Sequence, residues 1–101
     1  MELIEQQPHF WELYQQQDHY YFGFAVDTGD AMHCWYLQLT EQQILDYQFE
    51  GIEAIECLAK KFTEQVYQAN FIQLQAQQVD AATQAEMQYA FKQWYQTASN
   101  S

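Results

Sequence analysis

Residues 20–39 have the sequence YYFGFAVDTGDAMHCWYLQL, which contains two runs of aromatic and β-branched residues, 20–26 and 31–39. The polar residues 27–30 between them include a glycine, and two such runs joined by a short polar turn are typical of a β-hairpin. Alternation places four large apolar side chains of the first run on one face: Tyr20, Phe22, Phe24 and Val26. We therefore expect an antiparallel hairpin with one apolar face.

The sequence after this hairpin has helical periodicity from residue 40 to about residue 67. Thr40 and Gln43 have the spacing of a capping box at its start. Apolar residues at helical spacing share one arc: Ile44, Leu45, Phe49, Ile52, Ile55, Leu58, Ala59, Phe62 and Val66. Gly51 near the edge of this arc either allows close packing or marks a bend. The pattern predicts a long amphipathic helix packed on the hairpin.

The two ends of the chain add further predicted elements. Pro8 at a first helical position predicts a helix over about residues 8–17. Residues 71–75 alternate enough for a third strand, although they could equally continue the long helix. Asp80 is a candidate N-cap for a last helix that ends near residue 95.

The predicted fold class is therefore α+β. We expect a single small domain over residues 1–96 and a frayed tail over residues 97–101. In this domain an antiparallel β-hairpin or three-stranded sheet packs against a long amphipathic helix, with N- and C-terminal helices.

Charge narrows the classes of partner. The 101 residues include 14 acidic residues and 3 basic ones, a net charge of −11 with histidine neutral. Residues 1–59 contain no Lys or Arg, and the three lysines are Lys60, Lys61 and Lys92. Direct binding to nucleic acid or to an anionic membrane needs basic side chains, so we expect neither. No export signal or spanning segment is predicted, and we expect a cytoplasmic protein.

The histidines and cysteines do not have the spacing of a zinc site, which needs three or four ligands at short recurring intervals. Neighbouring residues on a strand point to opposite faces, so His33 is expected to point outward and Cys34 inward. Cys34 and Cys57 are expected to be free thiols. We predict no metal, no cofactor and no catalytic residues.

One short motif suggests chemistry. Residues 24–29, FAVDTG, resemble the active-site loop of the retroviral aspartic proteases, a resemblance that implies a catalytic role for Asp27 in a homodimer. The later apolar-apolar-Gly segment of that family is missing, and Asp and Gly are favoured in turns for conformational reasons. A turn is the preferred interpretation, and an enzyme that uses Asp27 or a Cys/His pair is the remaining catalytic alternative.

The strongest candidate for a functional surface is a row of carboxylates. Asp46, Glu50 and Glu53 are spaced i, i+4 and i+7, which places them on one face of a continuous helix. With Glu56 and two aromatic residues, Trp35 and Tyr47, they form the predicted partner-binding set. Because such a row presents negative groups at intervals of several ångströms, as a phosphate backbone does, it could occupy a basic groove.

These features predict a non-enzymatic acidic inhibitor or immunity-type protein. It would block the basic site of a toxin, nuclease or other nucleic-acid-handling protein, and its partner would be that basic protein. In composition the chain is similar to small acidic immunity, antitoxin and phage-encoded inhibitor proteins. Two alternatives remain, namely a solvated helix face without a charged target, and a structural or adaptor protein that forms a homodimer through an aromatic surface.

Overall fold

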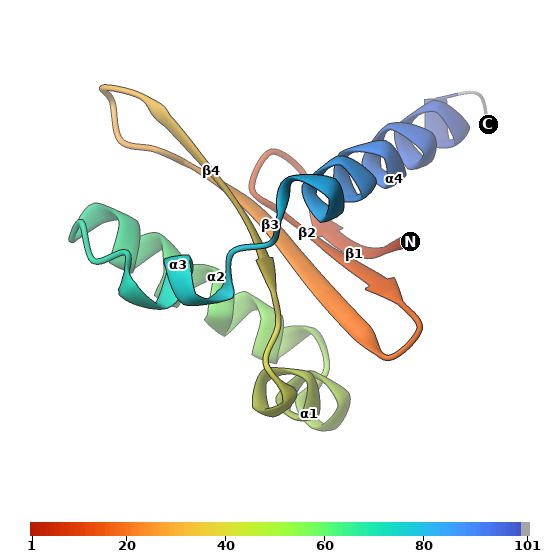
Figure 1. Ribbon diagram of the computed structural model, residues 1–101, viewed down its shortest axis with the longest axis horizontal. Coiled ribbons are helices and arrows are strands. Elements are labelled where there is room, and N and C mark those ends of the chain that lie inside the picture. Colours follow the sequence, from red (N-terminus) through yellow and green to blue (C-terminus); the bar gives the residue numbers. More distant parts are fainter. Residues whose placement is uncertain (100–101) are drawn as a thin grey trace.

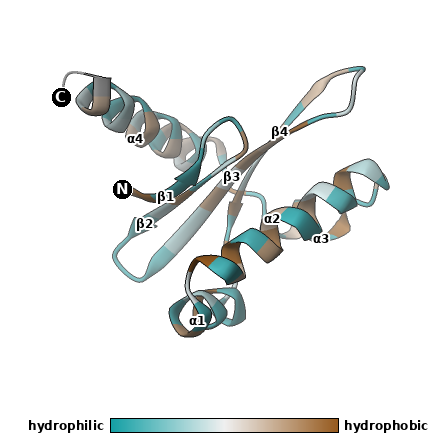
Figure 2. Ribbon diagram, turned by 180° about the vertical axis from the view of Figure 1, so that it is seen from behind, coloured by the Kyte–Doolittle hydropathy of each residue, from teal (hydrophilic) through white to brown (hydrophobic). Residues whose placement is uncertain are grey.

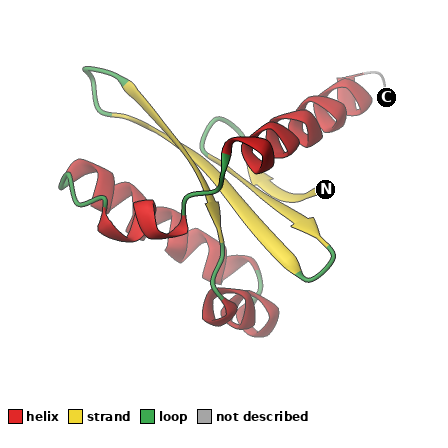
Figure 3. Cartoon of the chain, in the orientation of Figure 1, coloured by secondary structure: helices red, strands yellow, loops and turns green. Residues whose placement is uncertain are grey.

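The structure, a computed structural model, describes residues 1–99 and consists of a sheet followed by helices (Figure 1). In chain order the elements are β1 (Glu2–Gln7), β2 (Trp11–Gln16), β3 (His19–Asp27), β4 (Met32–Gln38), α1 (Glu41–Glu50), α2 (Ile52–Tyr67), α3 (Ile72–Gln77) and α4 (Ala81–Ser99). The four strands pair antiparallel in the order β1-β2-β3-β4. Figure 3 shows the strands in yellow and the helices in red. The predicted α+β class is confirmed, but the sheet has four strands and not two or three.

Helices cover both faces of this sheet. The larger core lies on the face covered by α1, α2 and α3, where Phe62 of α2 stacks on Phe24 with ring centroids 5.7 Å apart. On the other face, Met87 of α4 is fully buried against Tyr14 and Tyr21. Figure 2 shows apolar and hydrophilic residues alternating along α2, as expected of an amphipathic helix. The sheet is therefore the middle layer of three.

The predicted hairpin is β3–β4. Tyr20, Phe22, Phe24 and Val26 are all buried on the α2 side, as the alternation predicts. In the turn, the Gly29 N–H donates to Oδ1 of Asp27 at 2.9 Å. Because this carboxylate holds the turn, the Asp-Thr-Gly sequence has a conformational explanation.

The predicted helix over residues 8–17 is wrong, because this segment forms the β1–β2 turn and strand β2. His9 adopts a left-handed conformation with φ of 64°, and the Phe10 N–H donates to the Gln7 carbonyl at 3.0 Å. β2 lies inside the sheet, so Leu13 and Tyr14 are both buried, on opposite faces. Burial on both faces removes the alternation of a half-exposed strand and imitates helical spacing.

The predicted helix over residues 40–67 divides in two at Gly51. Its start is as predicted, since the Gln43 N–H donates to Oγ1 of Thr40 in a capping box. Gly51 has φ of 76° and ψ of −147°, which ends α1, and α2 begins at the next residue. The break changes the helical phase, so Leu45 and Phe49 lie outside the core instead of in it, with exposures of 57% and 92%.

Replacing Gly51 tests this break. Gly51→Ala is expected to lower the free energy of unfolding by about 1–3 kcal/mol, because an L-residue is strained at this backbone conformation. Gly23→Ala is the control, since Gly23 lies in β3 without a positive φ, and its added Cβ would make ordinary contact with Tyr36 at 3.5 Å. Urea unfolding of both variants measures the difference. Equal losses would contradict the assigned role of Gly51.

Residues 71–75 adopt neither of the two predicted forms, because α2 ends at Tyr67 and residues 72–75 belong to the separate short helix α3, with Phe71 as its N-cap. α3 is held by Gln77, whose Nε2 donates to Oε1 of Gln43 at 2.8 Å and to the Gln38 carbonyl at 3.0 Å. The predicted N-cap of the last helix is confirmed, because the Thr83 N–H donates to Oδ1 of Asp80 at 2.8 Å.

α4 continues through residues 97–99, while the rest of the predicted frayed tail, residues 100–101, lies outside the described part of the chain. Among the described residues, no helix is both long enough and apolar enough to cross a bilayer.

Candidate functional sites

The predicted carboxylates are exposed, but they do not form a continuous row. Asp46 and Glu50 lie on α1, whereas Glu53 and Glu56 lie on α2 beyond the break at Gly51. The i, i+4, i+7 geometry of one helix therefore applies only to the first two. Asp46 and Glu50 border a shallow hollow of about 150 Å³ between the helices, whose other lining residues come from α2: Ala54, Cys57, Leu58 and Lys61.

The two predicted aromatic contacts belong to the packed interior more than to this surface. Trp35 is half-buried and stacks on Phe71, with ring centroids 5.7 Å apart and planes 21° apart. Tyr47 is half-buried, and its ring packs edge-on against that of Tyr20 with the ring centroids 5.9 Å apart. Its hydroxyl donates to Oε1 of Glu5 at 3.4 Å. The structure does not bring Trp35 to the carboxylates, and it turns Tyr47 toward the sheet.

The apolar centre of the acidic surface was not predicted from the sequence. Leu45 and Phe49 are one turn apart on α1 and share its outer face, and Ile52 begins α2 just beyond Gly51 with an exposure of 37%. Exposed carboxylates lie on the same two helices, and we call these residues together the acidic α1–α2 face: Leu45, Phe49, Ile52, Glu41, Asp46, Glu50 and Glu53. Gly51 was the available signal, because the break there separates the apolar face of α1 from that of α2.

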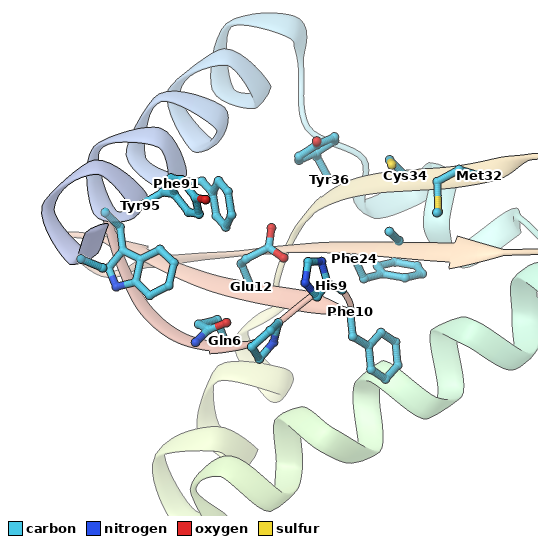
Figure 4. Close-up of a pocket in the computed structure, with 14 residues that line it drawn as sticks. Gln6, His9, Phe10, Glu12, Phe24, Met32, Cys34, Tyr36, Phe91 and Tyr95 are labelled. Carbon is cyan, nitrogen blue, oxygen red and sulfur yellow. The ribbon is translucent and has the colours of Figure 1, made fainter. Parts of the chain in front are cut away.

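A second candidate site is a pocket of about 550 Å³ under the C-terminal half of α4 (Figure 4). We call it the α4 pocket. Its walls come from segments distant in sequence, namely the β1–β2 turn, strands β2 to β4, and α4. Most of the lining is apolar or aromatic, and its acidic side chain is Glu12 of β2. Such a concave apolar site with few polar groups is typical of ligand-binding pockets.

Glu12 is an unusual residue for this position. Burial raises the pKa of its carboxyl, and the Tyr14 hydroxyl, which donates to Oε1 at 3.5 Å, offsets this only in part. Gly23 lies directly opposite in the register, and a Cβ there would lie 3.7 Å from Oε1 of Glu12. The missing side chain of Gly23 leaves space beside the carboxylate.

The raised pKa of Glu12 predicts a pH-dependent stability. The folded state favours the neutral carboxyl, while the unfolded chain loses the proton near the ordinary pKa of 4.5. The contribution of Glu12 to the free energy of unfolding is therefore fully present below about pH 4.5, and it is lost as the pH rises through the folded-state pKa of this carboxyl. Glu12→Gln should unfold at higher urea concentration than the wild type at pH 7, and this gain should vanish below pH 4.5.

Glu53→Gln is the control, since it removes the same charge from an exposed position on α2. It corrects for the general relief of repulsion in a chain of net charge −11. If Glu12→Gln and Glu53→Gln raise the free energy of unfolding equally at pH 7, burial of Glu12 is not the cause of the stabilisation.

The remaining candidates for chemistry are not assembled into a site. Cys34 is exposed and lines the α4 pocket, whereas His33 is half-buried, so the predicted orientations are wrong. The reason is that α2 and α3 cover the face on which His33 lies. Both cysteines are free, and no group of three or more His, Cys, Asp or Glu residues suited to a metal ion exists among residues 1–99.

Searches against protein-family models, curated proteins and solved structures found no match to this chain.

Proposed function

We propose that this protein is a non-enzymatic acidic binding protein that blocks the basic site of a toxin, nuclease or other nucleic-acid-handling protein. The observation that carries the proposal is Phe49, whose side chain is 92% exposed on a surface bordered by carboxylates. An exposed phenylalanine with neighbouring Leu45 and Ile52 is the kind of apolar centre that protein interfaces use, with polar groups at the rim.

The carboxylates on α1 and α2 add electrostatic attraction to this apolar contact. Asp46 and Glu50 lie within one helical turn of Phe49 on α1, and Glu53 lies in the first turn of α2. Their negative field would attract a basic protein and orient it before contact, because long-range charge complementarity raises association rates. The partner would then need a basic groove with an apolar recess for Phe49. A groove that binds nucleic acid is basic, since it must neutralise phosphates.

The homodimer alternative is supported by a different observation. Tyr89 and Tyr95 of α4 are 65% and 59% exposed, and tyrosine is enriched at interfaces. Sedimentation at micromolar concentration separates the two functions. The inhibitor proposal expects a monomer in the absence of its partner, whereas a stable dimer whose mass does not change with salt supports the alternative.

The partner can be sought by affinity capture with a salt gradient, using immobilised wild-type protein and a Phe49→Ala column in parallel. We expect a basic protein that is held by the wild type and released between about 0.05 and 0.2 M salt, since screening weakens exposed charge pairs. The Phe49→Ala column should release it at lower salt, because the apolar contact is missing. A captured protein that is acidic, or one held equally by both columns at all salt concentrations, would contradict the proposal.

A further inference from the structure

The α4 pocket has the chemistry of a site for organic cations. Its α4 wall is aromatic, since Phe91 stacks on Tyr95 with centroids 6.3 Å apart and lies 5.8 Å from the ring of Trp94. Tyr36 of β4 faces this wall across the pocket. The faces of aromatic rings carry negative electrostatic potential and attract cations, indole most strongly.

The charged groups of the pocket point to the same ligand class. Glu12 projects from β2 toward α4 (Figure 4), and its hydrogen bond to the neutral Tyr14 hydroxyl leaves its charge uncompensated. Among the described residues, no Lys or Arg lines the pocket, and His9 is the one lining group of this part of the chain that can become cationic. An anionic ligand would therefore meet a half-buried carboxylate without a countercharge, whereas a cationic ligand would pair with it.

We propose that the α4 pocket binds a small organic cation with an apolar body, such as an aryl-alkyl ammonium, with Glu12 as the counter-ion. The ammonium group would contact the Glu12 carboxylate, and the apolar body would lie against the aromatic side chains of α4. The volume of about 550 Å³ is within the usual range for small-molecule sites. This site is separate from the acidic α1–α2 face, so the proposal does not depend on a basic protein partner.

Three ligands of similar size test the charge requirement on the wild-type protein: 2-phenylethylammonium, 2-phenylethanol and phenylacetate. Calorimetric titration at pH 7 should give a Kd for the ammonium about tenfold or more below that for the alcohol, and no binding of phenylacetate. Equal affinity for the ammonium and the alcohol, or binding of phenylacetate, would overturn the proposal. This comparison needs no variant and is therefore independent of any folding defect.

Two charge-matched variants test the role of Glu12. Glu12→Gln should weaken ammonium binding to the level of the alcohol, whereas Glu64→Gln should leave it unchanged, because Glu64 is exposed on α2 outside the pocket. Both variants remove one negative charge, so non-specific attraction of the cation by the acidic chain cannot produce the difference. Equal weakening in the two variants, or none at Glu12, would overturn the assignment.

The alkylation rates of the two free cysteines show where the ligand binds. Cys34 lines the α4 pocket, whereas Cys57 is exposed on α2 in the hollow beside Asp46. Saturating 2-phenylethylammonium should slow the alkylation of Cys34 by iodoacetamide severalfold and leave the rate at Cys57 unchanged. Mass spectrometry of the peptides reports both rates in one sample. An unchanged rate at Cys34, or slowing at Cys57 alone, would place the ligand elsewhere and overturn the proposal.

Discussion

Phe62→Ala is expected to lower the free energy of unfolding by about 3–5 kcal/mol, the usual cost of truncating a buried phenylalanine. Phe62 is fully buried and joins α2 to the sheet, with its ring 5.7 Å from that of Phe24 and 6.0 Å from that of Phe22. A small domain has a total stability of about 5–15 kcal/mol. The variant should therefore be close to unfolding at 37 °C, and urea titration followed by circular dichroism measures the loss.

Phe49→Ala is the matched control, because it makes the same substitution at a residue 92% exposed on α1. We expect it to change the free energy of unfolding by less than about 0.5 kcal/mol. The predicted continuous helix over residues 40–67 placed both phenylalanines on its apolar arc. Similar large losses in both variants would support that helix and contradict the break at Gly51.

The elements that were predicted correctly have local signals. The β3–β4 turn is fixed by Asp27 and Gly29, α1 begins at the Thr40 capping box, and α4 begins at the Asp80 N-cap. Each depends on hydrogen bonds between residues at most three positions apart. Their geometry is therefore encoded in a few neighbouring residues.

The errors arose where tertiary packing decides the structure. β2 was predicted as helix because it is buried on both faces, and its second face exists only because α4 returns to cover it. The orientations of His33 and Cys34 were wrong because α2 and α3 cover the face on which His33 lies, while Cys34 lies on the α4 side. A sequence pattern that assumes one buried face cannot detect a three-layer arrangement.

The candidate sites were predicted only in part. The exposed carboxylates Asp46, Glu50, Glu53 and Glu56 were named from the sequence, but their apolar neighbour Phe49 was placed in the core. The α4 pocket was not predicted at all, because its walls come from the β1–β2 turn, β4 and α4. Helical phase and contacts between distant segments are not visible in local spacing.

The largest effect on binding is expected from reversing three charges of the acidic α1–α2 face. The triple variant Asp46→Lys, Glu50→Lys and Glu53→Lys should weaken binding to the captured basic partner at least hundredfold, about 3 kcal/mol. In this variant three attractive contacts become repulsive. Like charges brought together at an interface cost several kcal/mol. Surface plasmon resonance at about 0.05 and 0.2 M salt measures the change and its salt dependence.

A second triple variant controls for net charge. Glu2→Lys, Asp30→Lys and Glu86→Lys make the same charge change at exposed positions on β1, the β3–β4 turn and α4. This variant should mainly slow association, with a loss of affinity about tenfold or less, because its charges act only at long range. If the two triple variants lose equal affinity, the interaction depends on overall charge and the acidic α1–α2 face is not its site.

The most direct test is the alkylation of the two cysteines in the complex with the basic partner. Cys57 lies in the hollow bordered by Asp46 and Glu50, whereas Cys34 lies in the α4 pocket on the other face of the sheet. A partner docked on the acidic α1–α2 face should slow the alkylation of Cys57 at least tenfold and leave Cys34 at its free rate. Protection of Cys34, or unchanged rates at both thiols in a saturated complex, would contradict the account.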